Sequence, residues 1–177
     1  MDKNGVSPVI ATVLLLVLTV IIAGVIFSVV IPFVKDSLGD SKVCLNALEG
    51  VQFAESKFNC FNSSTISTSG FETGLSIKLN KEEISGFRVA LTDETGSSDV
   101  FDIKSGAEFE NVRMVRSAWA SAGEFNAVEF PSVGGQRSYV VAKKYQKAEV
   151  SPIITSGEIC SVADTIEFEP CYRDVVL

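Results

Sequence analysis

The stretch that decides the fold is Val6–Val34, with the sequence VSPVIATVLLLVLTVIIAGVIFSVVIPFV. From Asn4 to Val34 the chain carries no charged residue. A bilayer core needs roughly 20 apolar residues in a helix, and at about 1.5 Å per residue this stretch would extend over roughly 43 Å. The sequence therefore predicts one hydrophobic helix that is longer than a bilayer requires.

This helix is predicted to be apolar on every side, which leaves it no stripe that faces water. Gly24 and Ser28 lie four residues apart, and small residues at this spacing let another helix approach closely in lipid. Pro32 is expected to kink or end the helix near Ile31 because proline lacks the N–H that the helix uses. We expect lipid or other apolar helices around the stretch.

The stretch does not fit an ordinary cleaved secretory signal, whose apolar region has about 7–15 residues and ends in small residues. Pro32-Phe33-Val34-Lys35 is a poor small-residue cleavage site. Lys3 precedes the stretch and Lys35 follows it, so the positive-inside rule favours a cytoplasmic N-terminus only slightly. The cysteines further along the chain favour the same orientation, because disulfides form outside the cytoplasm.

The residues Gly5-Val6-Ser7-Pro8-Val9-Ile10, followed by the Val/Leu/Ile-rich stretch to Val30, resemble the N-terminus of an archaeal type IV pilin. In that family a prepilin peptidase removes a short charged leader, a class III signal peptide, on the cytoplasmic side. The resemblance implies a cut after Gly5 that leaves Val6 as the new N-terminus. Bacterial type IV pilins carry a glutamate where this chain has Ile10, so the likeness is to the archaeal branch.

Residues 35–177 are long enough for one domain with its own core. Alternation of apolar and polar residues, which is typical of half-buried strands, occurs at 75–80, 87–92 and 165–169, with shorter runs at 51–53, 100–103, 125–130 and 139–141. Turn-forming residues separate these runs, and 112–122 fits a strand or a short helix. The pattern predicts an antiparallel β-sandwich, with an immunoglobulin-like arrangement as one form. The fold class in sum is α+β.

We therefore expect four segments along the chain. They are a prepilin leader at 1–5, a hydrophobic stalk or transmembrane helix at 6–34, a linker at 35–42 and an extracellular β-rich head at 43–177. The linker contains small polar residues and Gly39, which suggest a turn or hinge.

The chain has four cysteines, an even number that is expected to form disulfides in an extracytoplasmic domain: Cys44, Cys60, Cys160 and Cys171. Four cysteines allow three connectivities, and we expect nearest neighbours to pair, Cys44 with Cys60 and Cys160 with Cys171. No two of them have zinc-site spacing, and the chain has no histidine. Asn62-Ser63-Ser64 is the only N-glycosylation sequon and lies in the polar, loop-like stretch 62–70.

The composition argues against catalysis and against nucleic-acid binding. The chain has 22 acidic and 15 basic residues and a net charge of −7. It is therefore expected to bind nucleic acid poorly, because phosphate backbones attract clusters of Lys and Arg. The absence of histidine removes the Ser-His-Asp and Cys-His designs. No enzyme activity, cofactor or metal is therefore expected.

Two groups of charged residues have an alternative interpretation. Four carboxylates around a turn offer oxygen ligands to calcium, but solvated side chains at a hairpin are favoured because EF-hand spacing is absent: Asp93, Glu94, Asp99 and Asp102. Six basic residues are assigned to exposed strand faces and a loop rather than to one basic patch: Arg113, Arg116, Arg137, Lys143, Lys144 and Lys147.

The favoured interpretation is a structural subunit of an archaeal type IV pilus-like surface filament that serves adhesion or attachment. The resemblance implies several partners: other copies of the chain in a helical homopolymer, the prepilin peptidase, the pilus assembly machinery, and the membrane before assembly. The alternative is an uncleaved, non-polymerising membrane-anchored extracellular binding domain. A membrane-tethered enzyme is a third hypothesis, which the missing catalytic patterns disfavour.

Overall fold

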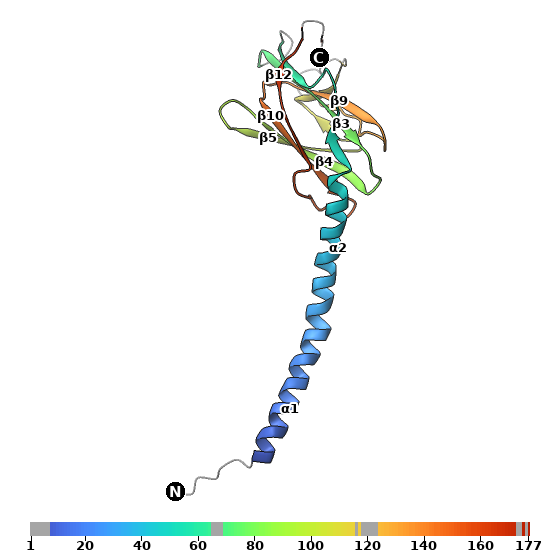
Figure 1. The fold of residues 1–177 in the computed structure, drawn as a ribbon. Coiled ribbons are helices and arrows are strands. Elements are labelled where there is room, and N and C mark those ends of the chain that lie inside the picture. Colours follow the sequence, from blue (N-terminus) through green and yellow to red (C-terminus); the bar gives the residue numbers. More distant parts are fainter. Residues whose placement is uncertain (1–7, 65–68, 116, 118–123, 173–174, 176) are drawn as a thin grey trace. The chain divides into compact units, whose positions relative to one another are not determined.

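The structure is a computed structural model. It describes residues 8–64, 69–115, 117, 124–172, 175 and 177. The chain divides into two compact units, Met1–Lys42 and Val43–Leu177. The described part of the first unit is helical, and the second unit, called the head below, is built mostly of strands (Figure 1). The predicted α+β fold, a long apolar helix followed by a β-rich domain of mainly antiparallel sheets, is confirmed.

The apolar stretch is helical from Pro8 onward. It comprises α1 (Pro8–Val25), the π-helical turn η1 (Ile26–Val30) and the start of α2 (Ile31–Leu48). Pro32 does not end the helix, contrary to one of the two outcomes expected from the sequence. The N–H of Ile31 donates to the carbonyl oxygen of Ile26, five residues earlier. This wider turn directly before Pro32 accommodates a ring that would otherwise clash with the preceding turn.

The turn or hinge expected at 35–42 is wrong, because α2 runs through this segment to Leu48. Gly39 is a single glycine within the helix, and it costs only about 1 kcal/mol relative to alanine. The final residues of α2 belong to the head, where Ala47 is fully buried. The helix ends where the N–H of Gly50 donates to the carbonyl oxygen of Ala47 at 2.8 Å.

Twelve strands are assigned to the described residues of the head. They are β1 (Val51–Phe53), β2 (Cys60–Ser63), β3 (Phe71–Leu79), β4 (Ile84–Thr92), β5 (Ser98–Lys104), β6 (Glu108–Phe109), β7 (Val112–Met114), β8 (Asn126–Ala127), β9 (Gln136–Val141), β10 (Lys147–Ile154), β11 (Asp164–Glu167) and β12 (Glu169–Pro170). The three long alternating runs fall in β3, β4 and around β11, whereas β2, β6 and β10 have no predicted counterpart.

Most strands belong to two sheets (Figure 1). The larger sheet has the order β12-β2-β3-β9-β7, with β1 also paired to β3, and the smaller sheet has the order β11-β10-β4-β5. Neighbouring strands are antiparallel except β12 and β2, which run parallel. β6 and β8 form a separate two-stranded sheet.

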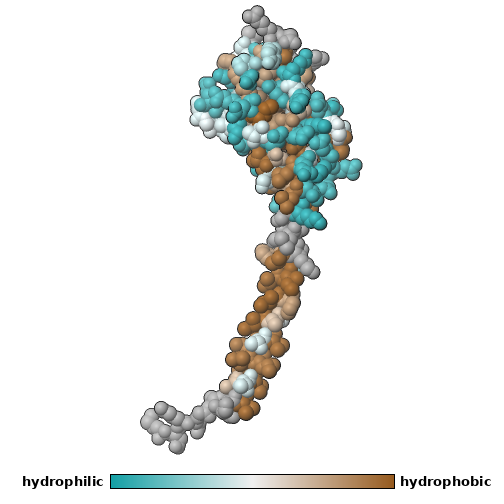
Figure 2. All heavy atoms as spheres, viewed as in Figure 1, coloured by the Kyte–Doolittle hydropathy of each residue, from teal (hydrophilic) through white to brown (hydrophobic). Residues whose placement is uncertain are grey.

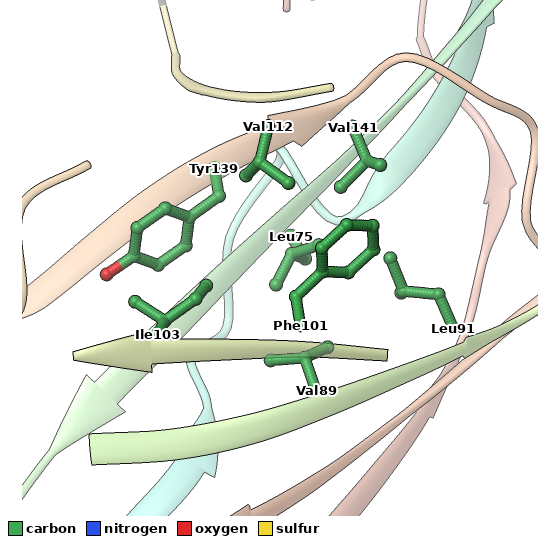
Figure 3. Close-up of a pocket in the computed structure, with 8 residues that line it drawn as sticks. All are labelled: Leu75, Val89, Leu91, Phe101, Ile103, Val112, Tyr139 and Val141. Atoms are coloured by element: carbon green, nitrogen blue, oxygen red, sulfur yellow. The ribbon is translucent and has the colours of Figure 1, made fainter. Parts of the chain in front are cut away.

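The hydrophobic core lies between the two sheets. Figure 3 shows side chains that meet there, Leu75, Tyr139 and Val141 from the larger sheet and Val89, Leu91 and Ile103 from the smaller. All six are at most 2% exposed, and the cluster encloses no space large enough for a water molecule. This part of the core is closed to ligands, so function must be sought on the surfaces.

Two disulfides join parts of the head that are far apart in the sequence. Cys44 pairs with Cys160 and Cys60 with Cys171, at sequence separations of 116 and 111 residues. The expected nearest-neighbour pairing is therefore wrong. β12 lies parallel to β2 and brings Cys171 beside Cys60, while the N–H of Cys160 donates to Pro152 of β10 at 2.9 Å.

We predict that peptide mapping of the full chain without reductant recovers the pairs Cys44–Cys160 and Cys60–Cys171. Replacing either pair by alanines is expected to lower the free energy of unfolding by roughly 3–5 kcal/mol, because each bond closes a loop of more than 100 residues. Denaturant unfolding in detergent, followed by circular dichroism, measures both losses, which should be similar. A peptide that links Cys44 to Cys60 would contradict this fold.

Candidate functional site

The candidate functional site is the apolar surface of the N-terminal helix. Every side chain from Val9 to Val30 is exposed, and large ones such as Leu15 and Phe27 are 67% and 70% exposed. Figure 2 shows this helix as an almost continuous apolar surface. By length and composition, Val9–Val34 is one helix able to cross a membrane. An apolar surface of this extent needs lipid or other apolar helices to cover it.

The few polar side chains of this helix make their hydrogen bonds within it. The hydroxyls of Thr12 and Thr19 donate to carbonyl oxygens three residues earlier at 2.9 and 2.8 Å, and Ser28 does the same at 3.3 Å. The donor of each hydroxyl group is therefore already hydrogen-bonded when the helix enters an apolar environment. The hydroxyl donors of this helix therefore need no hydrogen-bond partner from the lipid or helices around it.

Gly24 leaves an open notch on the same surface. A Cβ atom added at this position would meet no other atom within 4 Å. Small residues at helix surfaces allow close backbone approach in lipid or in a helical bundle. The notch is a place where a neighbouring helix can come close to this one.

The sequence predicts two sites of covalent processing, the leader cleavage junction and the N-glycosylation sequon. Gly5 and Val6, the predicted cleavage junction, lie outside the described residues. Asn62 lies in strand β2 rather than in a loop, opposite Glu72 of β3, and its side chain is exposed. The exposed position is compatible with a glycan, and modification of Asn62 stays a prediction.

The aspartates of the β4–β5 turn and of β5 contact cations of the chain itself. Lys143 Nζ lies 2.9 Å from a carboxylate oxygen of both Asp93 and Asp99. The hydroxyl of Tyr145 also donates to Asp99 at 2.7 Å. Arg88 binds Asp102 through two hydrogen bonds of 2.6 and 2.8 Å. Among the described residues, no group of three or more His, Cys, Asp or Glu side chains could hold a metal ion.

These contacts stabilise the charged form of the aspartates. Hydrogen bonds from the Thr95 side chain, then Lys143, hold the pKa of Asp93 well below its usual range. The pKa of Asp99 is lowered by Tyr145 and then by Lys143. A hydrogen bond from Arg88 lowers the pKa of Asp102. The negative charges thus fasten the turn to the segment between β9 and β10.

Arg113 is not on an exposed face, contrary to the expectation for the basic residues. Its side chain is 5% exposed and lies 3.1 Å from a carboxylate oxygen of Glu72, and its guanidinium also donates to the carbonyl oxygen of Ser117 at 2.8 Å. Glu72 is 41 positions away, so no local pattern predicts this pair. Arg137, Lys144 and Lys147 each pair with a glutamate, and Arg116 lies outside the described residues.

We predict that the head loses stability in acid through this network. A group whose pKa is lower in the folded state stabilises that state above its unfolded pKa, about 3.9 for aspartate. The free energy of unfolding should therefore stay level from pH 7 to about 5 and fall below about pH 4. Asp93→Asn should be less stable at pH 7 and should show a shallower fall. Urea unfolding at a series of pH values measures this.

The matched control is Glu158→Gln, because Glu158 is exposed and its side chain makes no hydrogen bond or ion pair with the described residues. It should follow the wild-type pH curve. An Asp93→Asn variant with the same acid slope as the wild type would contradict the role given to the aspartate.

Comparison with known protein families places the N-terminal part of the chain. The family described as archaeal type IV pilin, N-terminal, matches residues 4–40. Comparison with curated proteins and with solved structures found no match. The matched segment contains the Gly5-Val6-Ser7-Pro8 junction and the whole exposed apolar surface. The resemblance to an archaeal type IV pilin is thereby confirmed over the N-terminal segment, residues 4–40.

Proposed function

We propose that this chain is a structural subunit of an archaeal type IV pilus-like surface filament. One observation carries the proposal: the segment that matches the pilin family contains a helix whose apolar side chains from Val9 to Val30 all remain exposed. Such a helix suits two successive environments, first the membrane and then the apolar core of a filament. The proposed partners are other copies of the chain, a prepilin peptidase and the assembly machinery.

Processing precedes assembly in this proposal. The peptidase removes residues 1–5 on the cytoplasmic side, and Val6 becomes the N-terminus of a helix that stays in the membrane. The head then lies outside the cell, an oxidising environment in which the disulfides Cys44–Cys160 and Cys60–Cys171 persist. The sequence of events requires an N-terminus that faces the cytoplasm before assembly.

Assembly must be driven by packing rather than by hydrophobic transfer. Lipid tails and a bundle of apolar helices are similar solvents for Val, Leu and Ile, so the move between them is nearly neutral. Close helix–helix contact supplies the difference, and the open surface at Gly24 supports such contact. The internally bonded hydroxyls of Thr12 and Thr19 add no cost in either environment.

The head forms the outer coat of the filament in this proposal and serves adhesion or attachment. Its closed core and two disulfides support a role in which the domain withstands an extracellular environment. No catalytic role is assigned to it.

We predict that Gly5→Leu blocks removal of the leader, because a peptidase needs an extended, unhindered backbone at the cut, which glycine provides. Gly24→Leu is the matched control: it makes the same change within the apolar helix, where the added side chain has open space. Mass spectrometry of the mature chain should find Val6 as the first residue in the wild type and in Gly24→Leu. In Gly5→Leu the leader should remain.

A wild-type chain that keeps residues 1–5 on the cell surface would contradict the proposal. That result would favour the alternative, an uncleaved membrane-anchored extracellular binding domain.

A further inference from the structure

A groove of about 520 Å³ opens on the head where the edges of the two sheets come together. This volume is within the usual range of small-ligand sites. Strands β2 and β12 of the larger sheet contribute to it, as do β4, β10 and β11 of the smaller sheet. The lining residues used below are Phe61, Gln146, Glu167, Glu169, Pro170 and the pair Lys144 and Lys147.

Three polar side chains of the groove are available to a ligand. Gln146, Glu167 and Glu169 are exposed, and their side chains make no hydrogen bond or ion pair with the described residues. Together they offer an amide donor and several acceptor oxygens. The groove therefore presents hydrogen-bonding groups that folding of the head has not used.

The remaining lining residues are held in place. Lys144 Nζ lies 3.1 Å from a carboxylate oxygen of Glu94. The same Nζ lies over the ring of Phe61, 5.1 Å from the ring centroid. Lys147 Nζ lies 2.6 Å from a carboxylate oxygen of Glu149. Phe61 and Pro170 supply apolar surface beside these charged groups. The lining thus combines apolar patches with fixed donors and acceptors.

An extended peptide fits this groove poorly, because its backbone needs free backbone groups on the wall. The N–H of Gln146 donates to Thr92, and that of Phe168 donates to Gln146. Pro170, on the edge strand β12, has no N–H. Recognition must therefore use side chains rather than a strand added to the sheet.

An anionic ligand is also disfavoured. The lining has three carboxylates, those of Asp93, Glu167 and Glu169, and two ammonium groups that are already paired with glutamates. The chain as a whole carries a net charge of −7. This excess of carboxylates disfavours an anion, and the unpaired amide and carboxylates of Gln146, Glu167 and Glu169 suit a ligand that presents several hydroxyl groups.

We propose that this groove binds a neutral oligosaccharide. Sugar hydroxyls both donate and accept, which matches the amide and carboxylates, and the C–H faces of sugar rings suit the exposed ring of Pro170. Attachment would then occur through neutral sugars. The inference rests on the proposed function in one respect, the location of the groove outside the cell.

The test uses the full chain in a detergent without a sugar head group, such as dodecylphosphocholine. Saturation-transfer NMR and calorimetry measure binding of maltohexaose, mannohexaose and chitohexaose, with hexagalacturonate and a neutral decapeptide as comparators. We expect at least one neutral hexasaccharide to bind and both comparators to bind more weakly. The double variant Gln146→Ala/Glu167→Ala should raise its Kd at least about tenfold, since one charged hydrogen bond accounts for such a factor.

The matched control is Gln136→Ala/Glu158→Ala, which makes the same changes at exposed positions outside the groove. Its affinity should equal that of the wild type, and circular dichroism should show both variants folded. The inference is overturned if none of the three neutral oligosaccharides binds, if a comparator binds more tightly, or if both double variants behave alike. None of these results affects leader removal at Gly5, so the proposed function is judged separately.

Discussion

The helix Val9–Val34 has no polar face, and this constraint decides which environments the helix can occupy. Its large side chains are exposed except that of Ile31, and its hydroxyls bond to its own carbonyl oxygens. Water is therefore the one environment that does not suit it. Lipid and a bundle of like helices suit it about equally, so the same surface can serve first as an anchor and then as an assembly surface.

The head is built on a different principle, in which distant parts of the chain are fastened together. Both disulfides join its N-terminal part to its C-terminal part across more than 100 residues. The buried pair of Arg113 and Glu72 connects β7 to β3, and Lys143 fastens the β4–β5 turn to the segment after β9. These bonds join segments that are far apart in the sequence and hold the two sheets and the C-terminal part of the head together.

The sequence predicted those elements that depend on the pattern of neighbouring residues. The apolar stretch predicted the helix, and alternation located β3 and β4. Burial alternates along β4 from Phe87 onward, as expected for a strand with one buried face, whereas β3 is buried on both faces over most of its length. β10 was missed since Pro152 breaks its pattern. The carbonyl of Pro152 accepts from Cys160, so its missing N–H faces that side and leaves the ladder with β4 intact. The disulfide pairing, the partner of Arg113 and the groove residues depend on contacts between distant segments, for which a single sequence carries no signal.

The proposed function requires that this helix assembles with copies of itself. Its most direct test is electron cryo-microscopy of filaments sheared from the cell surface, with the subunit identified by mass spectrometry of the same sample. We expect filaments made of this chain, with residues 8–34 of many copies packed in the core and the heads outside. Filaments that lack the chain, together with recovery of the chain only as membrane-bound monomers, would contradict it.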